Sequence, residues 1–458
     1  MKKFLIIVLA LAFAVGLTCV AFAEVQNVKV SGDITALGIS RNLHIQKEAA
    51  PEYNHANNSL ASIARVKVSA DLTDNVSTTV RLLNERYWGS ENATGNNTNV
   101  DIDLAYASIK EFFYSPLSIM VGRQELHFGN DMIMGDPDTN NRVNGQSAFS
   151  VATGDPDLSA RKSFDAIRAT LNYDPLVIDA FYSRVNQAST NTITKDKTDL
   201  FGLNANYALG NKFGLKNTVL EGYFFYRGIG REATTPKTKA DTTYTVGGRL
   251  STELIDSLIF QLESAYQFGN RNNGVGSVFN ERRNAMALET ALSYTFKKVK
   301  TTPMATVGYA YFSGQKSTNV GANKAYRGWD PMYENQKFGD IANALIDQTN
   351  AHILMGQLSA KPLDDLTLKG EYYAFWWDKA YSDGDTVTTR RGDTLKMGTE
   401  KFVGQEIDLT LTYDYTEDVQ FGLLGGLFFP GKSFKSGTQD RSTTYVASEL
   451  IGSMKVSF

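Results

Sequence analysis

Residues 64–82, A-R-V-K-V-S-A-D-L-T-D-N-V-S-T-T-V-R-L, decide the fold class of this 458-residue chain. Every second position from 64 to 72 is apolar, and charged or hydroxyl residues such as Arg65 and Lys67 stand between them. The alternation resumes at Val76 after two turn residues. Successive side chains of a strand point to opposite faces, so this stretch predicts two neighbouring strands with one apolar and one polar face.

Blocks of this kind recur to the end of the chain, separated by turn residues. One block alone would also fit the half-buried sheet of a soluble protein. After residue 23, no apolar stretch approaches the roughly 18 residues that a membrane-spanning helix requires. Counting the blocks gives eighteen expected strands, near residues 27–42, 60–73, 76–86, 99–112, 117–126, 163–173, 176–185, 199–209, 217–227, 241–252, 257–268, 284–296, 303–312, 351–361, 365–377, 404–414, 418–428 and 445–458.

The links between these expected strands alternate between short and long. Residues 74–75, 174–175 and 416–417 are short links, whereas 127–162 and 313–350 are long and polar. Outer-membrane barrels have short periplasmic turns and long external loops, and an even number of strands puts both termini on the turn side. The pattern therefore predicts an all-β, antiparallel up-and-down transmembrane barrel of about eighteen strands, formed by residues 24–458 as one domain in a bacterial outer membrane.

The first 23 residues have the features of a secretory signal peptide. Two lysines precede an apolar run over residues 4–20, and an Ala-Phe-Ala cleavage site ends at Ala23. A single transmembrane helix is the competing interpretation, but no stop-transfer charges follow. The one cysteine, Cys19, lies in this segment, so cleavage would leave no thiol for a disulfide or a metal site. With 46 basic and 49 acidic residues, the chain also lacks the basic excess of a nucleic-acid-binding protein.

The chain ends on an alternating block whose last residue is Phe458. A terminal aromatic residue in this setting resembles the signal that the barrel-assembly machinery reads. That machinery and outer-membrane lipid are therefore the expected partners. Aromatic residues, 11% of the chain, also gather near the ends of expected strands, where outer-membrane barrels place their interfacial girdles. These groups are residues 87–88, 112–114, 223–226 and 372–377.

The polar face of the expected strands should line the interior of the barrel. An Arg or Lys that faced lipid near the midplane would cost about 2 to 4 kcal/mol. A bulge at Gly122 could shift the register near Arg123, Glu125 and Asp165. The expected lumen-facing charged residues are Arg65, Lys67, Asp71, Arg81, Glu85, Asp101, Asp103, Arg123, Glu125, Asp165, Arg168, Arg249, Glu263, Glu289, Lys369, Glu371, Glu406 and Asp408.

Eighteen strands enclose enough space for an aqueous channel, and rings of charge set the selectivity of such a channel. The basic residues could offset the desolvation of an anionic solute such as an oligo- or polysaccharide, whereas the carboxylates beside them would repel it. Alternatively, these charges form ion pairs across the lumen that stiffen the barrel. The sequence leaves both interpretations open.

The link 127–162 is long for an unstructured loop, and we hypothesise that it folds inward as a constriction. Its residues 136–141 invite a calcium interpretation, but Asn141 and Ser147 stand where an EF-hand needs Gly and Glu. A looser calcium site is an alternative. No Gly-x-Ser-x-Gly motif is present and the four histidines are scattered, so the sequence predicts no enzyme, no metal site and no cofactor.

Residues 121–135, V-G-R-Q-E-L-H-F-G-N-D-M-I-M-G, resemble the most recognisable stretch of the alginate export family. Further resemblances follow in the family's order, in residues 161–168 and 179–182, in 329–333, in 404–409 and in 429–431. Together they run over nearly the whole chain after residue 23. The resemblance implies an eighteen-stranded outer-membrane barrel that acts as a channel, with an anionic polysaccharide as the substrate class.

One link departs from the family. The characterised alginate exporter, whose barrel wall this chain resembles, closes its periplasmic mouth with a long turn between its sixteenth and seventeenth strands. Here that link is only residues 415–418. The expected pore is therefore constitutively open or restricted by loops, and solutes pass through it passively and filtered by charge. A general or phosphate-type porin with about sixteen strands is the alternative, and the strand count separates the two.

Overall fold

The structure, a computed structural model, describes most of the chain. The described residues are 26–46, 57–89, 100–137, 155–187, 197–212, 214–230, 240–272, 280–316, 324–390, 394–436 and 443–458. The expected signal peptide at residues 1–23 lies outside them. Within the described residues, no helix has the length and apolar character needed to cross a membrane.

Eighteen antiparallel strands form the wall, and the sequence prediction of this fold is confirmed. The strands are β1 (Gln26–Asn42), β2 (Asn57–Thr73), β3 (Val76–Tyr87), β4 (Asp101–Ile109), β5 (Leu117–Glu125), β6 (Ser163–Asn172), β7 (Leu176–Gln187), β8 (Lys197–Gly210), β9 (Lys216–Ile229), β10 (Asp241–Ile255), β11 (Leu258–Asn272), β12 (Asn280–Thr295), β13 (Met304–Phe312), β15 (Ala351–Leu363), β16 (Leu366–Trp377), β19 (Phe402–Asp414), β20 (Val419–Pro430) and β21 (Ala447–Ser457).

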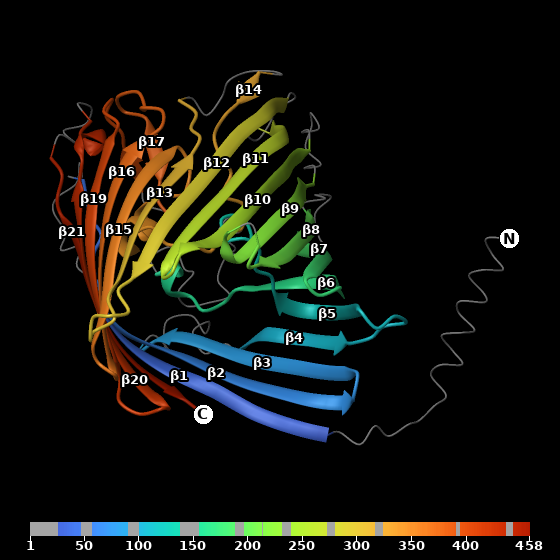
Figure 1. Ribbon diagram of the computed structural model, residues 1–458. Helices are drawn as coiled ribbons and strands as arrows, with labels where there is room; N and C mark the ends of the chain where they lie inside the picture. The colour runs from blue at the N-terminus through green and yellow to red at the C-terminus, as the bar shows by residue number, and fades with distance from the viewer. Residues whose placement is uncertain are drawn as a thin grey trace.

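The barrel closes where the last strand pairs with the first. The pairing of β1 with β21 runs from Asp33 opposite Ser457 to Asn42 opposite Ser448. Beyond it, the backbone N–H groups of Gly32 and Phe458 donate to each other's carbonyl oxygens at 2.8 and 3.0 Å. In Figure 1 the red strand β21 meets the blue strand β1 at this seam. Eighteen strands exclude the sixteen-stranded alternative.

The alternation that predicted the strands also separates their two faces. Val66 and Val68 of β2 are 41% and 40% exposed and face outward, whereas Arg65 pairs with Asp33 on the inner face. The outer face therefore presents apolar side chains to lipid. The link 415–418 between β19 and β20 is as short as the sequence indicated, and the backbone N–H of Tyr415 closes it by donating to the carbonyl oxygen of Val419.

The largest differences from the expected strand bounds lie at the external ends of β11 and β12. β11 continues to Asn272 and β12 begins at Asn280, whereas the sequence suggested 268 and 284. These extensions are polar on both faces, so they carry no alternation that could reveal them. The external link 273–279 is consequently shorter than the periplasmic link 296–303, and the alternation of short and long links is not strict.

An aromatic row crosses the outer face of β7 to β11, as expected for an interfacial girdle. Its members are paired across neighbouring strands, with ring centroids 4.8, 6.0, 5.0 and 5.2 Å apart in order. They are Tyr182, Phe201, Tyr226, Tyr244 and Phe268. The expectation that whole aromatic groups form girdles was wrong, because alternate members face inward. Tyr223 and Phe225 are 5% and 1% exposed inside the barrel, as are Tyr373 and Phe375 at 4% and 1%.

Small elements between the wall strands lie at the external end of the barrel or inside it (Figure 1). The strand β14 (Ala325–Tyr326) pairs in parallel with the external end of β12, and β17 (Thr386–Thr388) pairs with β18 (Thr394–Lys396). Short helical turns are η2 (Pro156–Leu158), α2 (Asp340–Leu345) and η3 (Lys432–Phe434). The helix α2 contacts β19, β20 and β21 as well as η2, so it lies within the barrel.

Candidate functional site

Three segments of the external links fold into the barrel and fill much of its interior. We call them the first segment (126–137), the second segment (155–160) and the third segment (329–346). Apolar residues of the first and third segments, such as Met132 and Ile341, are fully buried in one cluster with wall residues such as Phe181 and Phe312. The interior predicted to be aqueous therefore contains an apolar core. The hypothesis that the link 127–162 folds inward agrees with its described parts; residues 138–154 lie outside them.

Carboxylates of the wall hold the first segment. The backbone N–H of Gly129 donates to Glu221 Oε1 at 2.9 Å, and that of Asn130 donates to Glu263 Oε2 at 2.7 Å. Arg249 Nε donates to Asn130 Oδ1 at 2.6 Å. A charge-assisted hydrogen bond is about twice as strong as a neutral one. These contacts therefore fix the segment against β9, β10 and β11.

Asp330, the second residue of the third segment, is held between two arginines. Arg227 of β9 and Arg283 of β12 both pair with Asp330, the latter at 3.1 Å. Burial alone would raise the pKa of Asp330, but the two guanidinium groups outweigh it and lower the pKa from 3.8 to about 2. Asp330 is thus ionised at any physiological pH and anchors the segment to the wall.

Two further groups of contacts hold the rest of the third segment. Glu406 of β19 accepts hydrogen bonds from the backbone N–H groups of Ile341 and Ala342 at 2.7 and 2.8 Å. Gln336 Nε2 joins this segment to the first one, because it donates to both Asn130 O and Glu289 Oε2 at 2.8 Å. The first and third segments therefore behave as one unit that is attached to the wall.

The second segment is attached through one buried arginine. Arg41 of β1 is 1% exposed and pairs with Asp155 at 3.0 Å, with Asp157 at 2.7 Å and with Glu449 of β21 at 2.9 Å. Glu85 of β3 accepts the backbone N–H of Ala160 at 2.6 Å. This arrangement gives the buried guanidinium three carboxylate partners and holds residues 155–160 against the seam of the barrel.

Most of the charged residues predicted to line the lumen form ion pairs within the wall. Arg65 pairs with Asp33 at 2.9 Å, Arg168 with Asp179 at 2.8 Å, Arg249 with Glu221 at 3.4 Å and Lys369 with Glu371 at 2.6 Å. Arg81 pairs with both Asp103 and Glu125. Asp71 accepts a long hydrogen bond from Asn27, and Asp101 lies near Arg123. Lys67 forms neither an ion pair nor a side-chain hydrogen bond with any described residue.

The other predicted acids, Glu85, Glu263, Glu289, Glu406 and Asp408, receive hydrogen bonds from the inward segments. The sequence analysis placed them on the inner face but missed this anchoring role. These hydrogen bonds come from links that are distant in the sequence, so the sequence of the strand that carries the accepting carboxylate contains no sign of them.

Arg123 and Asp165 do not face the lumen, which corrects the prediction for these two residues. They pair with each other at 2.9 Å, and the register places Arg123 on the same face as Val121 and Asp165 on the same face as Ile167, which are 45% and 52% exposed. The inward neighbour of Asp165 is Phe164, which is 1% exposed. The pair lies near the external ends of β5 and β6, where an outward charge costs far less than at the membrane midplane.

The wall contains two pairs of like charges, and the two members of each pair lie opposite each other on neighbouring strands. Lys67 of β2 lies directly opposite Arg81 of β3, and Glu263 of β11 lies opposite Glu289 of β12. Half of the ring of eighteen strands separates the two pairs. Like charges at such positions are destabilising, so the arrangement is costly for the fold.

The acidic pair and the basic pair differ in solvent exposure. The first and third segments cover the acidic pair, so Glu263 and Glu289 are only 1% and 8% exposed. Lys67 stays exposed. In several wall ion pairs the cation is also the more exposed partner: side-chain exposure is 24% for Arg65 against 16% for Asp33, 27% for Arg168 against 5% for Asp179, and 36% for Lys369 against 9% for Glu371. The carboxylate is the more exposed partner where Arg81 pairs with Glu125, where Arg283 pairs with Asp241 and in the outward-facing pair of Arg123 with Asp165.

Sequence reasoning missed several residues of this site. Arg41 and Glu449 could have been found by parity, because each lies two positions from a buried apolar residue of its strand, Ile39 and Ile451. Asp330 lies in a link, where no strand periodicity exists that could indicate which way its side chain points. The resemblance in residues 329–333 was the one signal that pointed to it.

Gly129 tests how tightly the first segment is held. Its φ is 66°, and a Cβ on it would overlap the carboxylate of Glu263. We expect Gly129→Ala to destabilise the protein by about 2 kcal/mol more than the left-handed backbone strain alone, which is about 1 kcal/mol. Guanidinium unfolding in detergent measures this difference.

Gly210→Ala is the matched control, because Gly210 has a φ of 67° and its Cβ would meet nothing within 4 Å. Equal losses of stability in the two variants would contradict tight docking of the first segment.

Comparison with known proteins places this geometry among outer-membrane channels. The sequence profile of the alginate export family matches residues 27–448. No curated protein matches the chain in sequence. In fold, the chain is similar to OccK2 (OpdF) of Pseudomonas aeruginosa in complex with glucuronate, with a TM-score of 0.56, 10% identity and coverage of 94% of this chain and 99% of that one. OccAB3 of Acinetobacter baumannii has a TM-score of 0.54 and 12% identity, with coverage of 94% of this chain and 99% of that one. OpdQ of P. aeruginosa has a TM-score of 0.52 and 12% identity, with coverage of 95% of this chain and 100% of that one.

Proposed function

The chain belongs to the alginate export family and is a solute channel of the bacterial outer membrane, and from that premise we propose that it passes small acidic sugars by passive diffusion. The route that we propose runs along the wall formed by β2, β3 and β6, beside the three inward segments. Arg65, Lys67 and Arg168 line this route, and the predicted lining residues Asp71, Arg81, Asp101, Asp103 and Glu125 lie on the same part of the wall, on β2 to β5. The predicted residues Lys369 and Glu371 line the lumen farther around the ring, on β16.

The observation that carries the proposal is the difference in exposure between cations and carboxylates. Lys67 is exposed and Arg65 and Arg168 are partly exposed, whereas Glu263, Glu289 and Glu406 are covered by the inward segments. Asp71 and Glu125 are the carboxylates of the route that stay exposed. An exposed cation offsets the desolvation of a solute carboxylate, and a covered carboxylate that is already hydrogen-bonded repels it less. This favours the anionic interpretation over ion pairs that only stiffen the wall.

Two further considerations support a small solute. The inward segments leave less room than the empty barrel that a polysaccharide strand would use. The structurally similar OccK2 was crystallised with glucuronate, a single acidic sugar. We further propose that the chain has no enzymatic activity, that residues 1–23 are a signal peptide and that Phe458, exposed at the end of the closing strand, is read by the barrel-assembly machinery.

Lys67→Glu tests the proposal. Replacing one exposed cation by an anion should lower the permeability ratio of chloride to potassium by about tenfold, which corresponds to about 1.4 kcal/mol. The reversal potential of single channels in a planar bilayer under a potassium chloride gradient measures this ratio. Glucuronate should block the wild-type current, and neutral glucose should not.

Lys298→Glu is the control, because it makes the same charge change in the exposed periplasmic link 296–303. The proposal would be wrong if the wild-type channel preferred potassium, or if glucose blocked as well as glucuronate. The absence of any conductance would contradict the channel itself.

A further inference from the structure

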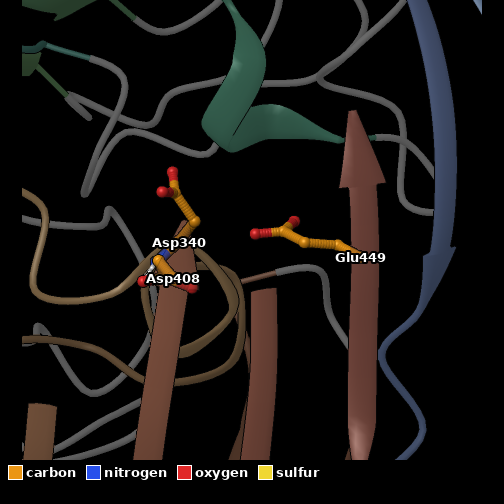
Figure 2. Close-up of side chains that lie close together, drawn as sticks. All are labelled: Asp340, Asp408 and Glu449. Atoms are coloured by element: carbon orange, nitrogen blue, oxygen red, sulfur yellow. Dashed lines mark hydrogen bonds between the residues drawn. The ribbon is translucent and has the colours of Figure 1, made fainter. Parts of the chain in front are cut away.

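Three carboxylates meet inside the barrel where the third segment touches the wall. Asp340 comes from α2, Asp408 from β19 and Glu449 from β21, and each offers an oxygen atom within 4.8 Å of the others (Figure 2). Asp408 and Glu449 are 1% and 5% exposed. The cluster therefore joins an inward link to two strands of the wall at a site shielded from bulk water.

One oxygen atom of each wall carboxylate has a partner. Glu449 Oε2 accepts from Arg41 Nε at 2.9 Å, and Asp408 Oδ2 accepts the backbone N–H of Asp340 at 3.3 Å. Asp340 Oδ1 pairs with Lys337 at 3.1 Å. The cluster is thus held in place by contacts that use only part of its oxygen atoms.

The remaining oxygen atoms, Asp408 Oδ1 and Glu449 Oε1, are buried and accept no hydrogen bond from an N–H or O–H group of any described residue. Both face the space above Gly426 of β20, since a Cβ on this glycine would lie 2.7 Å from Asp408 Oδ1 and 3.0 Å from Glu449 Oε1. A buried carboxylate oxygen without a donor costs free energy unless another group binds it. Two such atoms that point into one gap therefore indicate a missing partner.

The charges of the described residues around the gap do not balance. The paired cations here are Arg41 and Lys337, and Arg41 is shared with two acids of the second segment. Against these two cations stand six carboxylates: Asp155, Asp157, Asp340, Glu406, Asp408 and Glu449. Buried negative charge of this density is neutralised by a bound cation or by protons.

We propose that Asp340, Asp408 and Glu449 bind a calcium ion in the gap above Gly426. Calcium takes oxygen ligands in flexible geometry, and carboxylates from three separate elements with added water suit it better than a softer metal that prefers nitrogen or sulfur. The ion pins the third segment to β19 and β21. The site is distinct from residues 136–141, where the sequence alone suggested calcium, and it does not depend on the solute that the channel carries.

Calorimetric titration of calcium into the full-length protein in detergent, after treatment with EDTA, tests the proposal. We expect one site per chain, and Asp408→Asn should weaken binding by about tenfold or more. Gly426→Ala should weaken it to a similar degree although it removes no carboxylate, because its Cβ occupies the gap. Asp179→Asn, a buried wall carboxylate paired with Arg168, should leave the affinity unchanged.

Heat-modified electrophoretic mobility identifies variants that have folded. If Asp408→Asn does not fold, Gly426→Ala carries the test alone. Wild-type protein that binds no calcium would overturn the proposal and leave protons as the neutralising charge. Binding that is unchanged in Gly426→Ala would also overturn it, because the ion would then lie elsewhere.

Discussion

Replacing residues 127–162 with a four-residue Gly-Ser turn should raise the single-channel conductance at least about threefold, because an eighteen-stranded wall encloses a wide channel when nothing fills it. The excision removes the first and second segments together with their apolar contacts to the wall. The wall should persist, since β5 and β6 pair directly from Leu117 opposite Leu171 to Glu125 opposite Ser163. Planar-bilayer recordings measure the conductance.

Removal of residues 231–239, in the external link between β9 and β10, is the control for shortening a link, and we expect it to leave the conductance nearly unchanged. An unchanged conductance after excision of 127–162 would mean that the third segment alone restricts the pore. It would contradict the role that we assign to the first segment.

Asp330→Ala should lower the free energy of unfolding by about 3 kcal/mol, because breaking a buried ion pair leaves an uncompensated charge. Arg227 is only 7% exposed in its side chain and loses its carboxylate partner, whereas Arg283 keeps Asp241 at 2.8 Å. Guanidinium unfolding followed by tryptophan emission suits this measurement, since Trp329 is buried beside Asp330 at 3% exposure.

Two variants make this result specific. Asp330→Leu combined with Arg227→Met should recover most of the loss, because an apolar pair removes the buried charge altogether. Asp256→Ala removes an exposed acid paired with Lys297 and should leave stability nearly unchanged. A loss in the double variant equal to that of Asp330→Ala would show that the ion pair is not the cause.

The lowered pKa of Asp330 also sets the pH dependence of this anchor. A carboxyl whose pKa falls on folding contributes stability above its ordinary pKa and loses it as the pH falls through the folded value. For Asp330 that window runs from 3.8 down to about 2. The emission of Trp329 should therefore stay unshifted at mildly acidic pH and change only toward pH 2.

The strands were predictable because each is a local pattern with a strong physical cause. Lipid outside and polar groups inside impose period two on β2, and a two-residue link after Thr73 ends it. Where the two faces of a strand do not differ in polarity, or where the register is ambiguous, the prediction failed. The external ends of β11 and β12 are polar on both faces, and the orientation of Arg123 depended on a register that Gly122 made ambiguous.

The candidate site was predictable only in part. Parity placed Arg65, Lys67 and Arg168 on the inner face, and the same reasoning would have included Arg41 and Glu449. It could not show that Glu263 and Glu406 bind the backbone of distant links. Such contacts join residues 133 and 65 positions apart, and nothing in either local sequence records them.

The sequence by itself determined that the chain is an eighteen-stranded barrel, which residues form its wall and which face most of them take, because alternation against lipid is a property of each strand alone. Only the tertiary structure decided that three external segments fill much of the interior, that these segments cover carboxylates such as Glu263, Glu289 and Glu406 while Lys67 stays exposed, and that three acids converge above Gly426. Those features depend on where long links fold once the barrel has closed. Closure, unlike alternation, is a property of the whole chain.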